Sequence, residues 1–364
     1  MQSLLRDNFL ILEDIYMSNM PVYWKTRLDE VEETLNLVKK GKVTKVYDSA
    51  GGRPIYKVEY GTSNLPNPKG TANLSSALGA RDYKSYADKT GADYIPTVFL
   101  VGCVHGGEFE GTAALLNLIK LIETGTDYAG EKNDELVALA EKAHLIIIPM
   151  VNPDGRSHIP FDSYVGKTFY DLRYYNQGTW KDGSLAGWPE CKMKHPIKEY
   201  VDYLGGYFND DGVNMMHEDF FSGNLSTGTL AVLDVCRDEA PDFSILLHGG
   251  SNTTCCMLPP EYASLNAKIE VNKLELKIKE ACDKENVRYA VVGVRHLEEN
   301  DNPPSFNLPS VMHHCCGTPA VTYESNQGLC DHGTVIYDYD EIYKAHMILF
   351  AETIRFELDK FGKL

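Results

Sequence analysis

The chain has 364 residues, 43% of them hydrophobic, and a formal net charge of −17 at pH 7. A chain of this size can bury a substantial core as one large domain, and its acidic balance argues against nucleic acid or an anionic membrane as a partner. No window approaches 18 uninterrupted apolar residues, so no transmembrane helix is expected. The first residues show no signal-peptide pattern, and the nine cysteines show no CxxC spacing. We therefore expect a cytoplasmic protein with reduced thiols.

The predicted elements follow an order typical of an α/β domain. Residues 1–40 are charged and near a helical period, residues 43–60 predict two short strands around a turn, and residues 62–94 predict a long loop. Strands that alternate with helices then imply a mostly parallel sheet covered on both faces. The expected core strands are 97–103, 145–151, 243–247, 288–294 and 318–323, and the expected helices are 110–124, 133–142, 227–239, 265–285 and 339–360.

The segment 156–211 interrupts this alternation. It is dense in Tyr, Gly, Trp and Lys, has little periodicity, and is too long for an ordinary connection. Its aromatic content argues against disorder. We therefore expect an ordered excursion on the substrate side of the domain.

A histidine and a carboxylate three residues apart follow the first buried strand. His105 and Glu108 come after the apolar run 97–101, and in open α/β sheets sites are built at the carboxyl ends of strands. Imidazole plus carboxylate is two thirds of a His2Glu catalytic zinc site. Such a pair is common by chance, so its weight depends on a third ligand and a base.

Three further polar motifs stand where core strands end. The turn Asn-Pro-Asp-Gly at 152–155 is explained by its own turn chemistry. His248 follows an apolar strand and precedes two glycines, which let the backbone approach a bound group closely. Glu324 ends the last core strand, where a carboxylate is costly unless it is paired, liganding or reacting.

These four features, in this order, resemble the M14 zinc carboxypeptidases. Gly52-Arg53-Pro54-Ile55 is similar to an early strand of that family, and Gly212-Val213-Asn214 is similar to the opening of its GVD-type motif. The resemblance implies a mixed, mostly parallel sheet of about eight strands with helices on both faces. It divides the chain into an N-terminal helical segment, 1–40, and a catalytic domain, 41–364, with an atypical insertion at about 156–211.

The resemblance also implies the chemistry. His105, Glu108 and His248 would hold one zinc ion, which polarises the scissile carbonyl. Glu324 would be the general base that takes a proton from the attacking water.

An arginine after the NPDG turn would stabilise the oxyanion. Arg173 is our choice for this catalytic role, and Arg156 is the rival and a candidate for substrate binding.

The match is incomplete where the family clamps the terminal carboxylate of its substrate. The GVD-type motif normally continues into Asn-Arg, whereas Met216 and His217 stand at those positions here. An imidazole does not reproduce the bidentate fork of a guanidinium, and residues 290–322 contain no tyrosine to cap a substrate. We expect Asn214 and His217 to belong to an altered substrate subsite beside an intact hydrolytic centre.

Three functions follow from this pattern. The leading one is zinc-dependent hydrolysis of an amide bond in a peptide or peptide-like substrate by a metallocarboxypeptidase. The second is an N-acyl amino acid deacylase similar to succinylglutamate desuccinylase and aspartoacylase, which would take an N-acylated small molecule; the NPDG turn favours the peptidase. The third is a catalytically silent binding protein on the same fold, against which the retained ligands argue. The sequence carries no signal for an oligomeric state.

Overall fold

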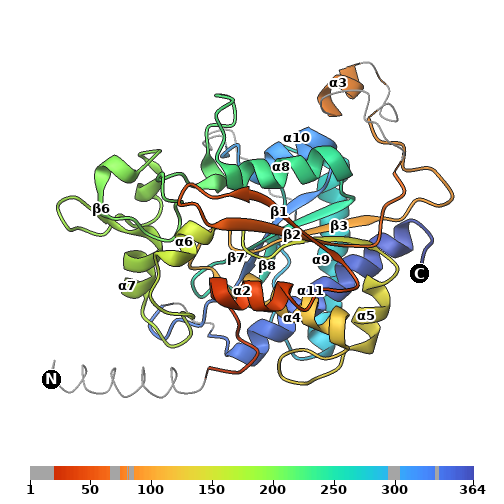
Figure 1. The fold of residues 1–364 in the computed structure, drawn as a ribbon, viewed down its shortest axis with the longest axis horizontal. Helices are drawn as coiled ribbons and strands as arrows, with labels where there is room; N and C mark the ends of the chain where they lie inside the picture. Colours follow the sequence, from red (N-terminus) through yellow and green to blue (C-terminus); the bar gives the residue numbers. More distant parts are fainter. Residues whose placement is uncertain (1–19, 66–73, 80, 82–85, 294–303, 333–335) are drawn as a thin grey trace.

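Figure 1 shows the computed structural model of the chain, which describes residues 20–65, 74–79, 81, 86–293, 304–332 and 336–364. A mixed sheet lies at its centre. The strands of this sheet are β1 (Lys42–Asp48), β2 (Pro54–Tyr60), β3 (Thr97–Val101), β4 (His144–Ile148), β7 (Phe243–Gly249), β8 (Cys256–Leu258) and β9 (Ala320–Ser325).

The sheet has seven strands in the order β1-β2-β4-β3-β7-β9-β8. The four central strands β4, β3, β7 and β9 run parallel, and antiparallel strands complete both edges. Strands β3 and β4 are buried along their whole length, which is typical of parallel strands covered on both faces. The mixed sheet is confirmed, with seven strands in the described residues where about eight were expected.

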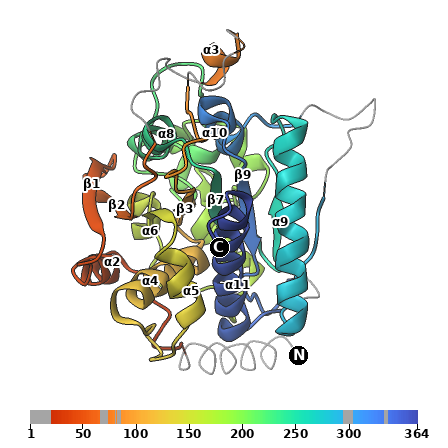
Figure 2. The same ribbon diagram turned by 90° about the vertical axis from the view of Figure 1, so that its right-hand side faces the viewer.

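Helices cover both faces of the sheet. One layer contains α2 (Leu28–Leu35), α4 (Phe109–Thr124), α5 (Asp134–Ala140), α9 (Leu265–Lys284) and α11 (Tyr339–Lys360), and the other contains α3 (Leu74–Gly79), α8 (Thr227–Glu239) and α10 (Leu308–Cys316). Figure 1 shows α8 and α10 above the strands and α4 and α11 below them. Figure 2 shows the two long helices α9 and α11 side by side. Each layer has its own apolar cluster against the sheet.

The amphipathic pattern explains why the long helices lie where they do. The buried side chains of α11 recur every three or four residues, so one apolar stripe faces the core. The helices expected at 110–124, 133–142, 227–239, 265–285 and 339–360 are all present, with ends that differ by at most a few residues.

One expectation about the elements needs correction, and another is tested only in part. The strand expected at 288–294 is wrong, because Tyr289 forms only an isolated bridge with Cys255 and residue 294 lies outside the described residues. In the N-terminal segment 1–40, helix α2 is present, while residues 1–19 lie outside the described residues.

The insertion at 156–211 is ordered. It follows the short helix α6 (Pro153–Ser157) and contains α7 (Phe169–Asp171), the turns η2 (Leu172–Gln177), η3 (Glu190–Lys192) and η4 (Lys198–Tyr200), and the small antiparallel sheet of β5 (Thr179–Trp180) and β6 (Val201–Tyr203). A separate apolar cluster packs within it. The insertion therefore has a core of its own, beside the main sheet (Figure 1).

The structure also gives two facts about the whole chain. None of the nine cysteines forms a disulfide bond. Among the helices of the described ranges, none combines the length and the apolar character that crossing a membrane requires.

Candidate active site

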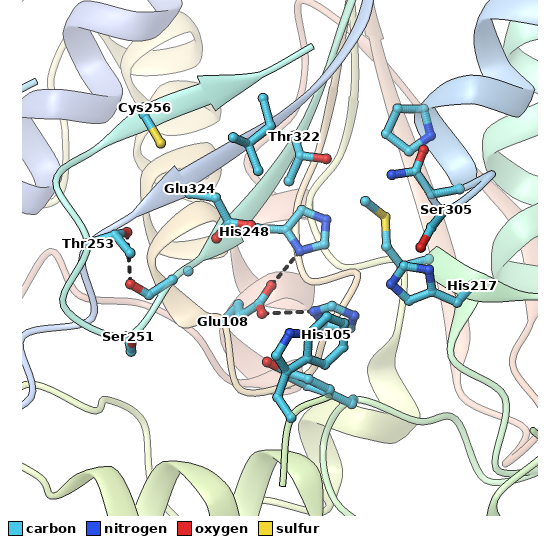
Figure 3. A pocket seen from close by; sticks show the side chains of 18 of the residues that line it. His105, Glu108, His217, His248, Ser251, Thr253, Cys256, Ser305, Thr322 and Glu324 are labelled. Carbon is cyan, nitrogen blue, oxygen red and sulfur yellow. Dashed lines mark hydrogen bonds and ion pairs between the residues drawn. The ribbon is translucent and has the colours of Figure 1, made fainter. Parts of the chain in front are cut away.

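His105, Glu108 and His248 converge at the carboxyl ends of β3 and β7 (Figure 3). His105 Nδ1 lies 2.8 Å from Glu108 Oε1, and His248 Nδ1 lies 2.7 Å from Glu108 Oε2. One donor atom from each residue lies within 4.8 Å of the other two. The three side chains are buried, with exposed fractions of 5%, 3% and 2% for the residues in chain order. Two imidazoles and one carboxylate in this arrangement match the ligand set of a catalytic zinc site.

The bonding of these side chains tests whether they fit a metal ion. Glu108 Oε2 is buried and close to His248 but makes no hydrogen bond, and His248 Nε2 has no partner either. Burial raises the pKa of Glu108, but the two neighbouring imidazoles outweigh burial and bring the pKa to about 2. An ionised carboxylate that faces two ring nitrogens in a buried site suits zinc, a divalent cation that binds imidazole nitrogens and carboxylate oxygens.

Asn214 fixes the orientation of His105. Its Oδ1 lies 3.2 Å from His105 Nε2 and also accepts a hydrogen bond of 3.0 Å from the Met216 N–H, which identifies that atom as the oxygen. With the proton on Nε2, the lone pair of His105 Nδ1 faces Glu108 and His248, as a ligand requires. The Tyr207 ring stacks on the His105 ring, with 4.1 Å between the ring centroids. Asn214 does not line the cavity, and the substrate contact expected for it stays a prediction.

Glu324 lies next to this group at the end of β9. It is paired in register with His248 on β7. Its Oε2 lies so close to Gly250 that a Cβ there would stand 2.9 Å from it. Burial is the main cause that raises the pKa of Glu324 to about 7, with the charge of Glu108 adding to it and that of His248 opposing it. A carboxyl group with a pKa near neutrality can both take up and release a proton.

A cavity of about 840 Å³ opens onto the triad and Glu324. The insertion supplies one wall of this cavity, and its place on the substrate side of the domain stays a prediction. Figure 3 shows His217 and Ser305 on the side of the triad away from Ser251 and Cys256. The lining residues from the insertion are Phe169, Leu172, Gln177, Trp188, Lys192 and Tyr207.

Neither predicted arginine lines this cavity. The Arg156 guanidinium donates to the carbonyl oxygens of Thr26 and Ile159 and pairs with Asp162. Its donors are used inside the fold, so the substrate contact expected for Arg156 stays a prediction that requires the guanidinium to leave these partners. The Arg173 guanidinium lies against Gly187, where an added Cβ would stand 1.8 Å from Nη2. The oxyanion role of Arg173 stays a prediction, and it requires the side chain to turn toward the triad.

The sequence analysis missed Lys192, Trp188 and Tyr207. All three lie in the insertion and line the cavity. Their positions show no periodicity, so the only signal for them was the expectation that the aromatic segment faces the substrate.

A second group of potential ligands lies elsewhere in the described residues, formed by Glu59, His144 and Glu239. Lys57 Nζ lies 3.1 Å from Glu59 Oε2, and His144 Nε2 lies 3.2 Å from Glu59 Oε1. Because Glu59 already has two internal partners, this group is explained as an ion-pair cluster.

The motif order and this geometry agree with a family comparison. The model of the zinc carboxypeptidase family matches residues 31–171, which include His105 and Glu108. This region is therefore similar to the zinc carboxypeptidase family, and the match covers less than half of the chain. No curated protein matches the sequence.

Solved structures of zinc carboxypeptidase-family proteins share the fold. A metallo-carboxypeptidase from Burkholderia cenocepacia has a TM-score of 0.55 at 15% identity, with 92% of this chain and 68% of the other covered. One from Pseudomonas aeruginosa, solved with (2-guanidinoethylmercapto)succinic acid, has a TM-score of 0.53 at 14% identity, with coverage of 92% and 68%. Carboxypeptidase A from Helicoverpa armigera has a TM-score of 0.52 at 15% identity, with coverage of 98% and 81%. Together with the His2Glu group, the family match supports a zinc metallohydrolase.

Proposed function

We propose that this protein is a metallocarboxypeptidase that hydrolyses an amide bond in a peptide or peptide-like substrate. One observation carries the proposal: a buried His2Glu group and a carboxyl group with a pKa near 7 stand at the same edge of the sheet and face one cavity. The family match over residues 31–171 supports the same reaction class.

The chain's own residues divide the work as follows. A zinc ion held by His105, Glu108 and His248 would supply a Lewis acid that polarises the scissile carbonyl and lowers the pKa of water. Glu324 takes the proton of the attacking water and passes it to the leaving nitrogen. Asn214 holds the His105 ring in the tautomer that leaves Nδ1 free.

The ligand seen in one structural neighbour supports the choice of substrate. The Pseudomonas aeruginosa enzyme was solved with a substituted succinic acid, which carries carboxyl groups. A peptide-like substrate with a free carboxylate is therefore our first candidate for this chain.

An N-acyl amino acid deacylase is the second candidate. In the described residues no arginine lines the cavity, so the guanidinium clamp of a carboxypeptidase is missing there. The NPDG turn and the family match favour the peptidase.

Mass spectrometry of a mixed peptide library incubated with zinc-loaded protein tests the proposal. We expect one-residue ladders from the carboxyl terminus, reduced by about 10²- to 10⁴-fold in Glu324→Gln. Glu280→Gln is the matched control, because Glu280 lies on the solvent face of α9 and pairs only with Lys284. Glu324-dependent cleavage of N-acyl amino acids without peptide cleavage would establish the deacylase instead. Hydrolysis of neither class, or full activity in Glu324→Gln with zinc bound, contradicts the proposal.

A further inference from the structure

Lys192 is a cation of the cavity wall that has no charged partner among the described residues. It lies at the end of η3, is half-buried and lines the cavity. Its Nζ lies 3.9 Å from the centroid of the Trp188 ring. Within the described ranges of the chain, no carboxylate is found to interact with this ammonium group, and burial lowers its pKa. A partly buried charge without a counter-ion is unfavourable, so an anionic ligand would relieve it.

His217 cannot supply the positive charge of this wall. Its ring lies 5.7 Å from the Trp188 ring, and both residues line the cavity. Burial is the main cause that lowers the pKa of His217 to about 3, and the charge of Lys192 adds to it. His217 is therefore a neutral hydrogen-bonding group at neutral pH, although it stands where the family resemblance places an arginine.

Contacts between rings connect this wall to the metal ligands. Tyr207 stacks on His105 at 4.1 Å and meets Trp188 edge-on at 5.9 Å. Trp188 in turn carries Lys192 on its face. Lys192 thus belongs to the same wall as the His105 ligand. The other lysine that lines the described part of the cavity, Lys268, comes from α9 instead.

We propose that Lys192 binds the free carboxylate of the substrate, with His217 as a hydrogen-bonding neighbour, where the family has a guanidinium. The inference rests on the proposed function and adds a specificity-determining residue to it. An ammonium group is a compact charge without the planar fork of a guanidinium. The site therefore selects for a negative charge without imposing the bidentate geometry of an arginine.

Equilibrium binding of two matched libraries tests this assignment. The probes are N-acetylated tripeptides with a free terminal carboxylate and the same peptides as carboxamides. Both are incubated with Glu324→Gln protein loaded with zinc, so that binding is read without turnover. We expect the free acids to be retained about tenfold or more over the amides, because a charge-assisted hydrogen bond is lost in the amide.

Three substitutions in that background identify the residue. Lys192→Met keeps the length of the side chain and should abolish the preference for acids. Lys192→Arg should keep the preference, which separates a charge effect from a folding defect. Lys194→Met is the matched control, because Lys194 also lies over an aromatic ring, that of Tyr200, but is exposed and outside the cavity lining.

The binding experiment can contradict the role of Lys192 without contradicting the proposed hydrolytic function. Equal retention of acids and amides, no retention of either, or a preference that survives Lys192→Met overturns the assignment; the last result would point to Lys268. Failure of Glu324-dependent hydrolysis in the active protein would instead contradict the proposed function, and the binding readout would still report on Lys192. In active protein, Lys192→Met should raise KM for acids about tenfold with a smaller change in kcat, as expected for loss of uniform binding.

Discussion

His248 and Glu324 occupy paired positions on the adjacent parallel strands β7 and β9. Paired residues on neighbouring strands project from the same face at a separation of about 4.8 Å between strands. The sheet itself therefore sets the distance between a proposed metal ligand and the proposed base. Because both strands are buried in the core, this distance does not depend on a loop.

The contact between Asn214 and His105 predicts an effect on metal affinity. Asn214→Ala removes the acceptor for His105 Nε2, so we expect zinc affinity to fall by about 10- to 100-fold. Asn214→Asp keeps an acceptor oxygen and should preserve the affinity. Competition with a chromophoric chelator measures both constants. An unchanged affinity in Asn214→Ala would show that the contact does not orient the ligand.

Gly250 should affect rate without affecting stability. A Cβ at this position would stand 2.9 Å from Glu324 Oε2 and 2.9 Å from Thr253 Oγ1. The Glu324 carboxyl group ends a flexible side chain, whereas Thr253 is β-branched and stiff, so Gly250→Ala displaces the Glu324 carboxyl group at little cost in folding. We expect kcat to fall by about tenfold or more, since a small misplacement of a catalytic group is costly, with an unfolding free energy within about 1 kcal/mol of the parent. Equal kcat in the two proteins contradicts the placement of Glu324.

Gly106 should affect stability, because its neighbours are backbone atoms. A Cβ there would lie 1.9 Å from the carbonyl carbon of Gly155 and 2.1 Å from the Arg156 nitrogen. Gly106→Ala therefore pushes the NPDG turn away. We expect the free energy of unfolding to fall by about 3 kcal/mol or more, at or above the usual range for overpacking. Gly91→Ala is the control, since no atom stands within 4 Å of its added Cβ, and it should change stability by less than about 1 kcal/mol. Urea unfolding followed by circular dichroism distinguishes the two variants.

His346 predicts a pH dependence of stability. It is buried in α11 against Tyr323 and Phe350, and burial lowers its pKa to about 4. The unfolded chain has the ordinary pKa of about 6.5 and binds a proton below that pH, while the folded chain does so only near pH 4. The contribution of His346 to the free energy of unfolding is therefore fully present above pH 6.5. It falls as the pH decreases from 6.5 toward 4, and about 2 kcal/mol is lost at pH 5.

The test of this pH dependence compares two proteins. His346→Gln removes the titrating group, so the difference in unfolding free energy between pH 7.5 and pH 5 should be smaller in the variant. Equal differences in the two proteins would show that His346 is not protonated on unfolding in this range.

The hydrolytic centre was predictable from the sequence because its signals are local. Apolar runs mark buried strands, and His105, His248 and Glu324 stand directly after or at the end of such runs. Parallel strands bring their carboxyl ends to one edge of the sheet, so their order along the chain already implied that these side chains meet. The close approach of Gly106 to the NPDG turn gives a physical reason for a glycine between His105 and Glu108.

Local sequence patterns do not show features that distant contacts decide. Arg156 follows the NPDG turn as expected, but Thr26, 130 positions away in the chain, accepts its hydrogen bond and holds it inside the fold. The segment predicted as a strand at 288–294 has strand composition, yet among its described residues only Tyr289 forms a bridge, because β8 takes the place beside β9 at the edge of the sheet.

The sequence by itself determined the α/β class and predicted the candidate metal triad and Glu324, since strand ends and turns are encoded by neighbouring residues. Only the tertiary structure decided which side chains face the cavity from the insertion. That segment has no periodicity, and its packing against His105 and His217 through Tyr207 and Trp188 places Lys192 at the wall. The direction of a long side chain depends on such contacts, which no local pattern contains.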